Sequence, residues 1–322
     1  MRIVVLGGTR FIGRRIVSDL VARGDEVLIV HRGSTEPPDL PLCRHIHAAR
    51  ADYESIADEV RTFEPTAIVD TLCMSRADAD AVLPHLPEAQ LILLSSMDVY
   101  QAFWHVLNDS EGEPLPLTEA SPVRSSRFLY GEARGDHVGY EKLDVEPSYL
   151  DRGGTVLRLA MIYGEHDHQR REEFILRRVR AGRDRIPFGA GTFLWSRCHV
   201  ADVSSAVLAA IGNPLAASEV FNINEPTTRS VRGWAAQVLA AAGSSAELVT
   251  VADSALPEDM WITKAVPQQL VSGTSRATAV LGWQPSDPDQ RVAESVAWHL
   301  ANPPDDASSD FTADDAALAA AP

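Results

Sequence analysis

The stretch that decides the fold is MRIVVLGGTRFIGRRIVSDLVARG, residues 1–24. It opens with a short apolar run typical of a buried strand. From Phe11 onward, apolar residues recur at helical spacing until Gly24 ends the pattern. The turn between them, residues 7–13, has the glycines of a dinucleotide-binding turn except at Arg10, where glycine is usual. A strand, a glycine-rich turn and a helix in this order predict that the turn holds phosphate at the helix N-terminus.

Two arginines distinguish this turn and the strand that follows it. Arg10 fits only if its φ is negative and its Cβ points away from the ligand, and its guanidinium could then bind a phosphate. An NAD site usually has Asp or Glu at the end of the second strand to bind the ribose hydroxyls, whereas here that place reads Val-His-Arg-Gly, residues 30–33. We expect Arg10 and Arg32 to flank an adenosine 2′-phosphate, which favours NADP over NAD. The alternative is that both arginines are solvated surface residues.

The composition narrows the class of protein. The chain has 322 residues, 45% of them apolar and 23% charged, as in an ordinary globular protein with a large core. Its formal net charge of -16 argues against a nucleic-acid partner, which would need a basic surface. The three cysteines include no CxxC pair, and no apolar run is long enough to span a membrane. We therefore expect a cytoplasmic protein with reduced thiols and no membrane association.

Apolar strand candidates alternate with helical stretches and predict a doubly wound parallel sheet, the α/β Rossmann class. The expected strands are residues 3–6, 26–30, 67–71, 91–95 and 155–159. Residues 101–127 are expected to form a surface excursion, and helices are expected near 140–150, 170–185, 203–211 and 231–242. The predicted domains are a dinucleotide-binding domain at 1–165 with a returning segment near 196–225, a smaller substrate domain mainly at 166–302, and a disordered acidic tail at 303–322.

Short motifs along the chain resemble the extended short-chain dehydrogenase/reductases, the NAD-dependent epimerase/dehydratase group. In order they are GGTRFIG at 7–13, AD at 51–52, SSMDVY at 95–100, LTEASP at 117–122, LRLAMIYG at 157–164, HVADV at 199–203, VFNI at 220–223 and LGWQP at 281–285. The resemblance covers residues 1 to about 300. The arginine in the turn is similar to an atypical branch that includes the chloroplast stem-loop RNA-binding proteins.

The resemblance implies a cofactor site and a catalytic set. The expected cofactor-binding residues are Gly7, Thr9, Arg10, Phe11, Ile12, Gly13, Arg32, Asp52, Leu72 and Lys142. Enzymes of the family use a tyrosine as acid/base, a lysine four residues later that lowers the tyrosine pKa, and a serine or threonine that binds the reacting oxygen. Ser96 matches the serine by its place four residues before Tyr100.

The tyrosine and lysine fit the family pattern irregularly. Lys142 matches the lysine together with Glu146, but the tyrosine position before it is Val138. Tyr140 lies only two residues before Lys142, about 200° round a helix, so it could act only if the helix begins after it. We prefer this register, with Tyr140 as the acid/base.

Alternative site residues remain open. Tyr130 and Arg134 form a second register, in which both side chains would share a helix face. Asp98 lies near the place where dehydratases of the family carry an acid. The sequence His166-Asp167-His168 lacks further zinc-like ligands, and no metal site is expected.

Two functions are compatible with these features. The first is an NADP-preferring oxidoreductase or epimerase, with NAD also possible, that acts on a sugar-like or other hydroxylated small molecule. The second is a non-redox nucleotide-binding protein, regulatory or RNA-binding, because the irregular Tyr–Lys pair leaves redox activity open. Arginines crowd residues 170–185, where the family binds nucleotide-sugar diphosphates, although a solvated helix face explains them equally well. The expected partners are a small-molecule substrate, which could be a nucleotide-sugar, and a second copy of the chain in a homodimer.

Overall fold

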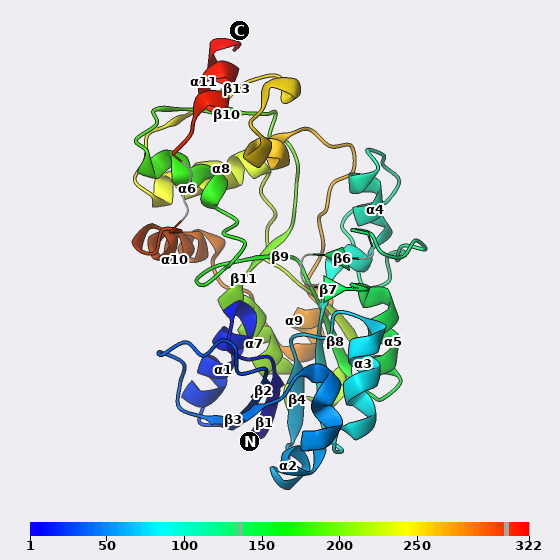
Figure 1. Cartoon of the computed structure of the whole chain (residues 1–322). Coiled ribbons are helices and arrows are strands. Elements are labelled where there is room, and N and C mark those ends of the chain that lie inside the picture. Colours follow the sequence, from blue (N-terminus) through cyan, green and yellow to red (C-terminus); the bar gives the residue numbers. More distant parts are fainter. Residues whose placement is uncertain (132, 135–136, 306–308, 322) are drawn as a thin grey trace.

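A seven-stranded parallel sheet forms the base of the molecule in the computed structural model, which describes residues 1–131, 133–134, 137–305 and 309–321 (Figure 1). The strand order is β12-β8-β5-β4-β1-β2-β3. The bounds are β1 Arg2–Leu6, β2 Glu26–His31, β3 Arg44–His47, β4 Ala67–Asp70, β5 Gln90–Ser96, β8 Thr155–Leu159 and β12 Val220–Ile223. The doubly wound parallel sheet expected from the sequence is confirmed.

Helices cover both faces of this sheet, which explains why its strands are apolar on both sides. Ile3 and Val5 of β1 point into one core cluster, and Val4 and Leu6 point into the other. Helices α1 and α7 pack together, as do α3 and α5 (Figure 1). The bounds of these helices are α1 Phe11–Ala22, α3 Arg76–Val82, α5 Lys142–Leu150 and α7 Val200–Ala210.

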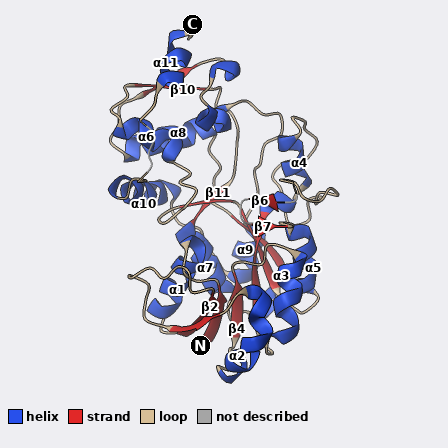
Figure 2. Cartoon of the chain, in the orientation of Figure 1, coloured by secondary structure: helices blue, strands red, loops and turns tan. Residues whose placement is uncertain are grey.

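A smaller, mostly helical part lies beyond the carboxyl ends of the sheet strands (Figures 1 and 2). Its elements are α6 Glu173–Arg180, α8 Val231–Ala241, α10 Pro288–Ala301, α11 Thr312–Ala319 and the parallel pair of β10 Arg185–Phe188 with β13 Glu247–Thr250. The remaining elements are α2 Ala57–Thr62, α4 Gln101–Leu107, α9 Ser275–Leu281, the antiparallel pair of β6 Ala133–Arg134 with β7 His137–Val138, and the parallel pair of β9 Met161–Tyr163 with β11 Arg197–His199.

The structure differs from the sequence prediction in three segments. Residues 101–107 form helix α4 within the expected surface excursion. The edge strand β3 was not predicted. In the segment 303–322, for which we expected disorder, residues 312–319 form helix α11, and its Asp314 and Ala317 are buried. The prediction of disorder is wrong for this helix, because a buried arginine partner compensates its acidic side chain, as described below.

Candidate functional site

The turn between β1 and α1 has the backbone geometry of a phosphate cradle. Gly7 has a φ of 82°, a conformation that L side chains rarely adopt. A Cβ on Gly13 would lie 2.1 Å from the carbonyl oxygen of Gly7, so only glycine lets the helix approach the strand this closely. Arg10 has a φ of −129°, the negative value that arginine needs there, and its side chain is exposed. The turn therefore fits the diphosphate of a dinucleotide, and Arg10 does not obstruct it.

Substitution of Gly13 by alanine should weaken dinucleotide binding about tenfold or more, since about 1.4 kcal/mol of strain already corresponds to a factor of ten. The new Cβ would press on backbone atoms of Gly7 and Gly8, which cannot rotate away. Fluorescence titration with NADPH measures the change. The matched control is Gly273→Ala, because a Cβ there would have no heavy atom within 4 Å. Equal affinities of the two variants would contradict this role of Gly13.

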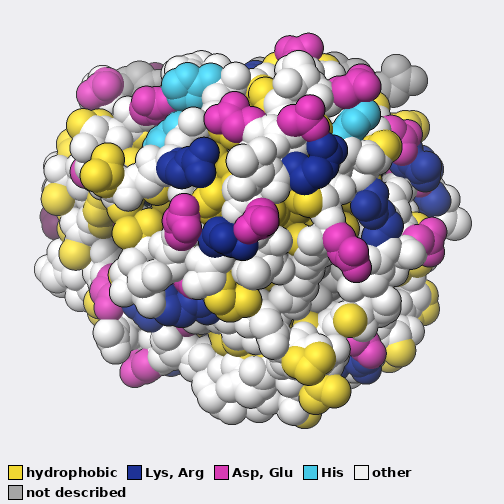
Figure 3. Space-filling model, turned by 90° about the horizontal axis from the view of Figure 1, so that it is seen from below, with side chains coloured by type: hydrophobic (Ala, Val, Ile, Leu, Met, Phe, Trp, Pro, Cys, Tyr) yellow, Lys and Arg dark blue, Asp and Glu magenta, His cyan; other side chains and the backbone are white. Residues whose placement is uncertain are grey.

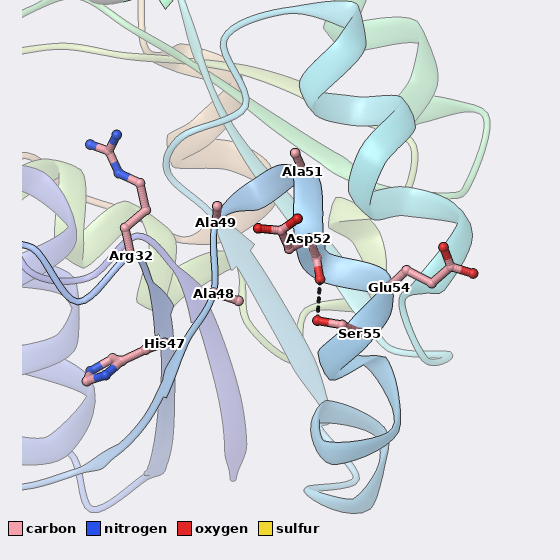
Figure 4. Close-up of a pocket in the computed structure, with 8 residues that line it drawn as sticks. All are labelled: Arg32, His47, Ala48, Ala49, Ala51, Asp52, Glu54 and Ser55. Carbon is pink, nitrogen blue, oxygen red and sulfur yellow. Dashed lines mark hydrogen bonds between the residues drawn. The ribbon is translucent and has the colours of Figure 1, made fainter.

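A pocket of about 720 Å³ lies at the carboxyl end of β2. Its lining comprises Arg32, His47, Ala48, Ala49, Ala51, Asp52, Glu54 and Ser55. Arg32 follows β2 on one side, and Asp52 belongs to the 3-10 turn Arg50–Ile56 on the other side (Figure 4). Leu72 contacts the turn itself, because its side chain occupies the space that a Cβ on Gly7 would need. Two of the predicted cofactor residues, Arg32 and Asp52, thus line this pocket, and a third, Leu72, packs on the turn.

Lys142 and Tyr140 lie at the start of α5, beside the ends of β4 and β5. The helix begins at Lys142, and its N-cap residue Glu141 is extended, with a φ of −157°. Tyr140 therefore precedes the helix. This is the arrangement that Tyr140 needs in order to act together with Lys142. Lys142 is 3% exposed, and its Nζ donates to the carbonyl oxygens of Cys73 at 2.6 Å and Leu94 at 3.0 Å. Burial lowers the pKa of Lys142, while nearby acidic groups, including Asp98, oppose that shift.

Asp98 joins this group through a buried hydrogen bond. The hydroxyl of Tyr140 donates to Oδ2 of Asp98 at 2.8 Å. Asp98 is held by the strand end, since its backbone N–H donates to Oγ of Ser96 at 3.2 Å. Ser96 ends β5 and is partly exposed. The chain thus brings a phenol, a carboxylate, an ammonium group and a hydroxyl to the carboxyl edge of the sheet, where α/β proteins bind ligands. The sequence had left Asp98 as an open alternative, because its contact with Tyr140 spans 42 positions.

The second register, Tyr130 with Arg134, does not form the expected helical pair. Tyr130 lies in a turn and Arg134 lies in β6, so the helix face assumed for the two residues is absent. The side chains of Arg134 and Val138 lie outside the described part of the structure. The ring of Tyr130 is 6.1 Å from the ring of Tyr140, which keeps Tyr130 beside the site.

The arginine-rich segment 170–185 is engaged in ion pairs within the chain. Arg178 is fully buried and donates to Asp314 of α11 and to Asp259. Arg177 also donates to Asp259, and Arg183 pairs with Asp315. These contacts favour a structural role over the phosphate site that the sequence allowed for this segment. No single position in the sequence indicates this outcome, because the acidic partners lie far along the chain.

Comparison with known proteins shows what this chain is similar to. Residues 89–224 match the model of the NAD dependent epimerase/dehydratase family. The chain is 27% identical over 337 residues to the "Chloroplast stem-loop binding protein of 41 kDa b, chloroplastic" of Arabidopsis thaliana. The alignment covers 98% of this chain and 84% of the relative. It is 25% identical over 306 residues to the "3-diazoavenalumate denitrifying reductase" of a Streptomyces species, covering 90% and 98% of the two chains.

Solved structures share the fold. A UDP-glucose 4-epimerase of Thermotoga maritima with UDP-glucose has a TM-score of 0.70 and 19% identity, covering 94% of this chain and 99% of that one. A dTDP-glucose 4,6-dehydratase of Bacillus anthracis in complex with NAD has a TM-score of 0.70 and 17% identity, covering 94% and 97%. The match to the family model over residues 89–224 bears out the resemblance to the extended short-chain dehydrogenase/reductases, and the solved structures confirm the fold.

No helix in the described residues is both long and apolar enough to cross a bilayer.

Proposed function

We propose that the protein is an NADP-preferring oxidoreductase or epimerase that acts on a sugar-like or other hydroxylated small molecule, with Tyr140 as its acid/base. The observation that carries the proposal is the buried hydrogen bond of Tyr140 to Asp98, beside the ammonium group of Lys142. Ser96 is the hydroxyl that binds the reacting oxygen. The nucleotide-sugars bound by the solved epimerase with UDP-glucose are one candidate substrate class.

The residues of this site are suited to move one proton. A bound nicotinamide would supply the acceptor or donor of the hydride. As the substrate is oxidised, its hydroxyl proton passes to Oη of Tyr140, while the phenolic proton of Tyr140 passes to Oδ2 of Asp98. The 2.8 Å hydrogen bond between these two atoms provides the path, so no free phenolate is required. Lys142 contributes positive charge that stabilises the carboxylate of Asp98 before the transfer.

The cofactor preference rests on Arg32 and Arg10. The Arg32→Ala variant should bind NADPH about ten- to a hundredfold more weakly, since a hydrogen bond to a charged group contributes about 1.5–3 kcal/mol. Its affinity for NADH should hardly change, because NADH has no 2′-phosphate. Fluorescence titration with both cofactors measures the two affinities.

The matched control for this prediction is Arg44→Ala. Arg44 begins the neighbouring strand β3 and stacks on the ring of Phe63, outside the pocket. Tighter binding of NADH than of NADPH by the unaltered protein would overturn the preference. If Arg32→Ala lost the same affinity for NADH as for NADPH, Arg32 would not recognise the 2′-phosphate.

A second candidate function is a non-redox nucleotide-binding protein, regulatory or RNA-binding. The similarity to the chloroplast stem-loop binding protein favours it. The formal net charge of -16 argues against RNA, and on the face shown in Figure 3 Lys and Arg side chains are interspersed with Asp and Glu. Turnover of NADP or NADPH on a panel of hydroxylated and carbonyl substrates separates the two. Tight cofactor binding without hydride transfer to any substrate would favour the second.

A further inference from the structure

Four potential metal ligands meet at the outer edge of the large sheet, where β3 pairs with β2. They are His31, Glu36, His45 and His47, and one ligand atom of each lies within 4.8 Å of all the others. The pairing of β2 with β3 sets His31 directly beside His47. His45 and His47 are two residues apart on one strand, so their side chains lie on the same face. Glu36 comes from the loop that joins the two strands.

The spacing of the ligand atoms suits a tetrahedral centre. Zn²⁺ binds imidazole nitrogen at about 2.0–2.1 Å, which places neighbouring ligand atoms about 3.3 Å apart in a tetrahedron. Nε2 of His31 lies 2.9 Å from Nδ1 of His45, and Oε1 of Glu36 lies 3.4 Å and 3.8 Å from these two nitrogens. Nε2 of His47 lies 2.5 Å from the same glutamate oxygen. Around an ion the pairs at 2.5 Å and 2.9 Å have to separate, and ligand atoms up to 4.8 Å apart have to approach one another.

We infer that His31, Glu36, His45 and His47 form a binding site for a divalent transition-metal ion of the Zn²⁺ class. Three imidazoles and one carboxylate are ligands that this class prefers over Mg²⁺ or Ca²⁺, which take oxygen ligands. The ion would bring two positive charges to a single carboxylate and three neutral rings. The sequence did not predict this site, since we expected no metal and considered only residues 166–168.

Protonation is compatible with binding after one tautomer change. The backbone N–H of Gly33 donates to Nδ1 of His31 at 3.2 Å, so the proton of the metal-free ring is on Nε2 and faces His45. Binding moves that proton to Nδ1 and gives up the long bond from Gly33. The thiol of Cys43 lies 3.6 Å from the other ring nitrogen of His45, where it can orient that ring.

The proposed site would fasten the loop 32–43 to the sheet edge. All four coordination positions are filled by side chains, which is typical of structural zinc rather than catalytic zinc. The loop begins with Arg32, and His47 lines the same pocket as Arg32 (Figure 4). An ion held here would therefore fix the segment that carries the proposed 2′-phosphate contact.

The test measures metal binding directly on the full chain. After treatment with a chelator and dialysis, titration with Zn²⁺ should show one ion per chain at micromolar affinity or better, with a rise of a few degrees in Tm. Co²⁺ should give the visible absorption of a tetrahedral centre. The His45→Asn/His47→Asn variant should lose at least about a hundredfold in affinity, since even outer partners of a metal site cost 10–100-fold.

His85→Asn is the matched control, because His85 lies in a separate 3-10 turn and should leave binding unchanged. Circular dichroism and Tm of the metal-free double variant show whether it folds, since both altered side chains lie on an edge strand. Glu36→Gln, in a loop, provides a second loss of affinity if the double variant does not fold. Absence of stoichiometric binding by the unaltered chain, or unchanged affinity in Glu36→Gln and in the folded double variant, would overturn the proposal.

Discussion

Replacement of Tyr140 by phenylalanine should lower kcat by about 10²–10⁴-fold, the usual contribution of a positioned acid/base. The change removes only the hydroxyl that donates to Asp98, and the ring keeps its place in the buried site. Binding of NADPH should be nearly unchanged, because the proposed role of Tyr140 concerns the substrate proton. Steady-state kinetics on a substrate found in the panel, together with NADPH titration, measure both effects.

Tyr130→Phe provides the matched control for this prediction. It removes the same atom from a ring 6.1 Å away, and it represents the alternative register that the sequence left open. Its kcat should stay within a small factor of the unaltered value. A large loss in Tyr130→Phe combined with normal turnover in Tyr140→Phe would assign the acid/base to Tyr130 instead.

Replacement of Asp314 by alanine should destabilise the protein by about 3 kcal/mol, at the low end of the range for breaking a buried ion pair. The side chains of Arg178 and Asp314 are both 0% exposed and joined by two hydrogen bonds of 2.6 and 2.8 Å. The change leaves the buried guanidinium with one carboxylate, that of Asp259, and this remaining partner limits the loss. Unfolding by urea, followed through tryptophan fluorescence, measures the free energy.

The adjacent residue supplies the control for the ion-pair prediction. Asp315 follows Asp314 in helix α11 and pairs with Arg183, but its side chain is 62% exposed. Asp315→Ala should therefore cost no more than about 1 kcal/mol, as for other surface pairs. If Asp314→Ala and Asp315→Ala lowered the free energy of unfolding by the same small amount, the buried ion pair would not stabilise the protein as proposed.

The sheet was predictable because its signal is local. The apolar runs at β1, β2, β4, β5 and β8 need no knowledge of partners, and each was expected within a residue or so of its observed bounds. The edge strand β3 reads Arg-His-Ile-His, with one buried apolar residue, so its pattern is too weak to recognise alone. Helix α11 was missed because its acidic residues indicate solvation unless the buried Arg178 is known to face them.

The candidate site likewise has residues that the local sequence predicts and residues that only the tertiary structure brings together. Gly7, Gly13 and Arg32 were expected from the chain order of strand, turn and helix; Gly7 and Gly13 meet in the turn, and Arg32 lines the pocket at the end of β2. Lys142 and Tyr140 were named from the family pattern, but whether Tyr140 stands outside the helix depends on where α5 begins. The proposed metal site could not be predicted from the sequence, because two of its four residues, His45 and His47, lie on strand β3, which was not recognised.

The contact between Arg178 and Asp314 also has a consequence for biosynthesis. The two residues are 136 positions apart, so at 5–20 residues per second the guanidinium is made on the order of ten seconds before its carboxylate. During that interval β12, the last strand of the large sheet, is completed, whereas the smaller part still lacks α11, which packs against β10. Chains that stop translation before Asp314 would thus carry a complete sheet and a guanidinium whose two carboxylate partners are reduced to one, that of Asp259, inside an unfinished second core. Such chains are the expected substrates of cellular quality control.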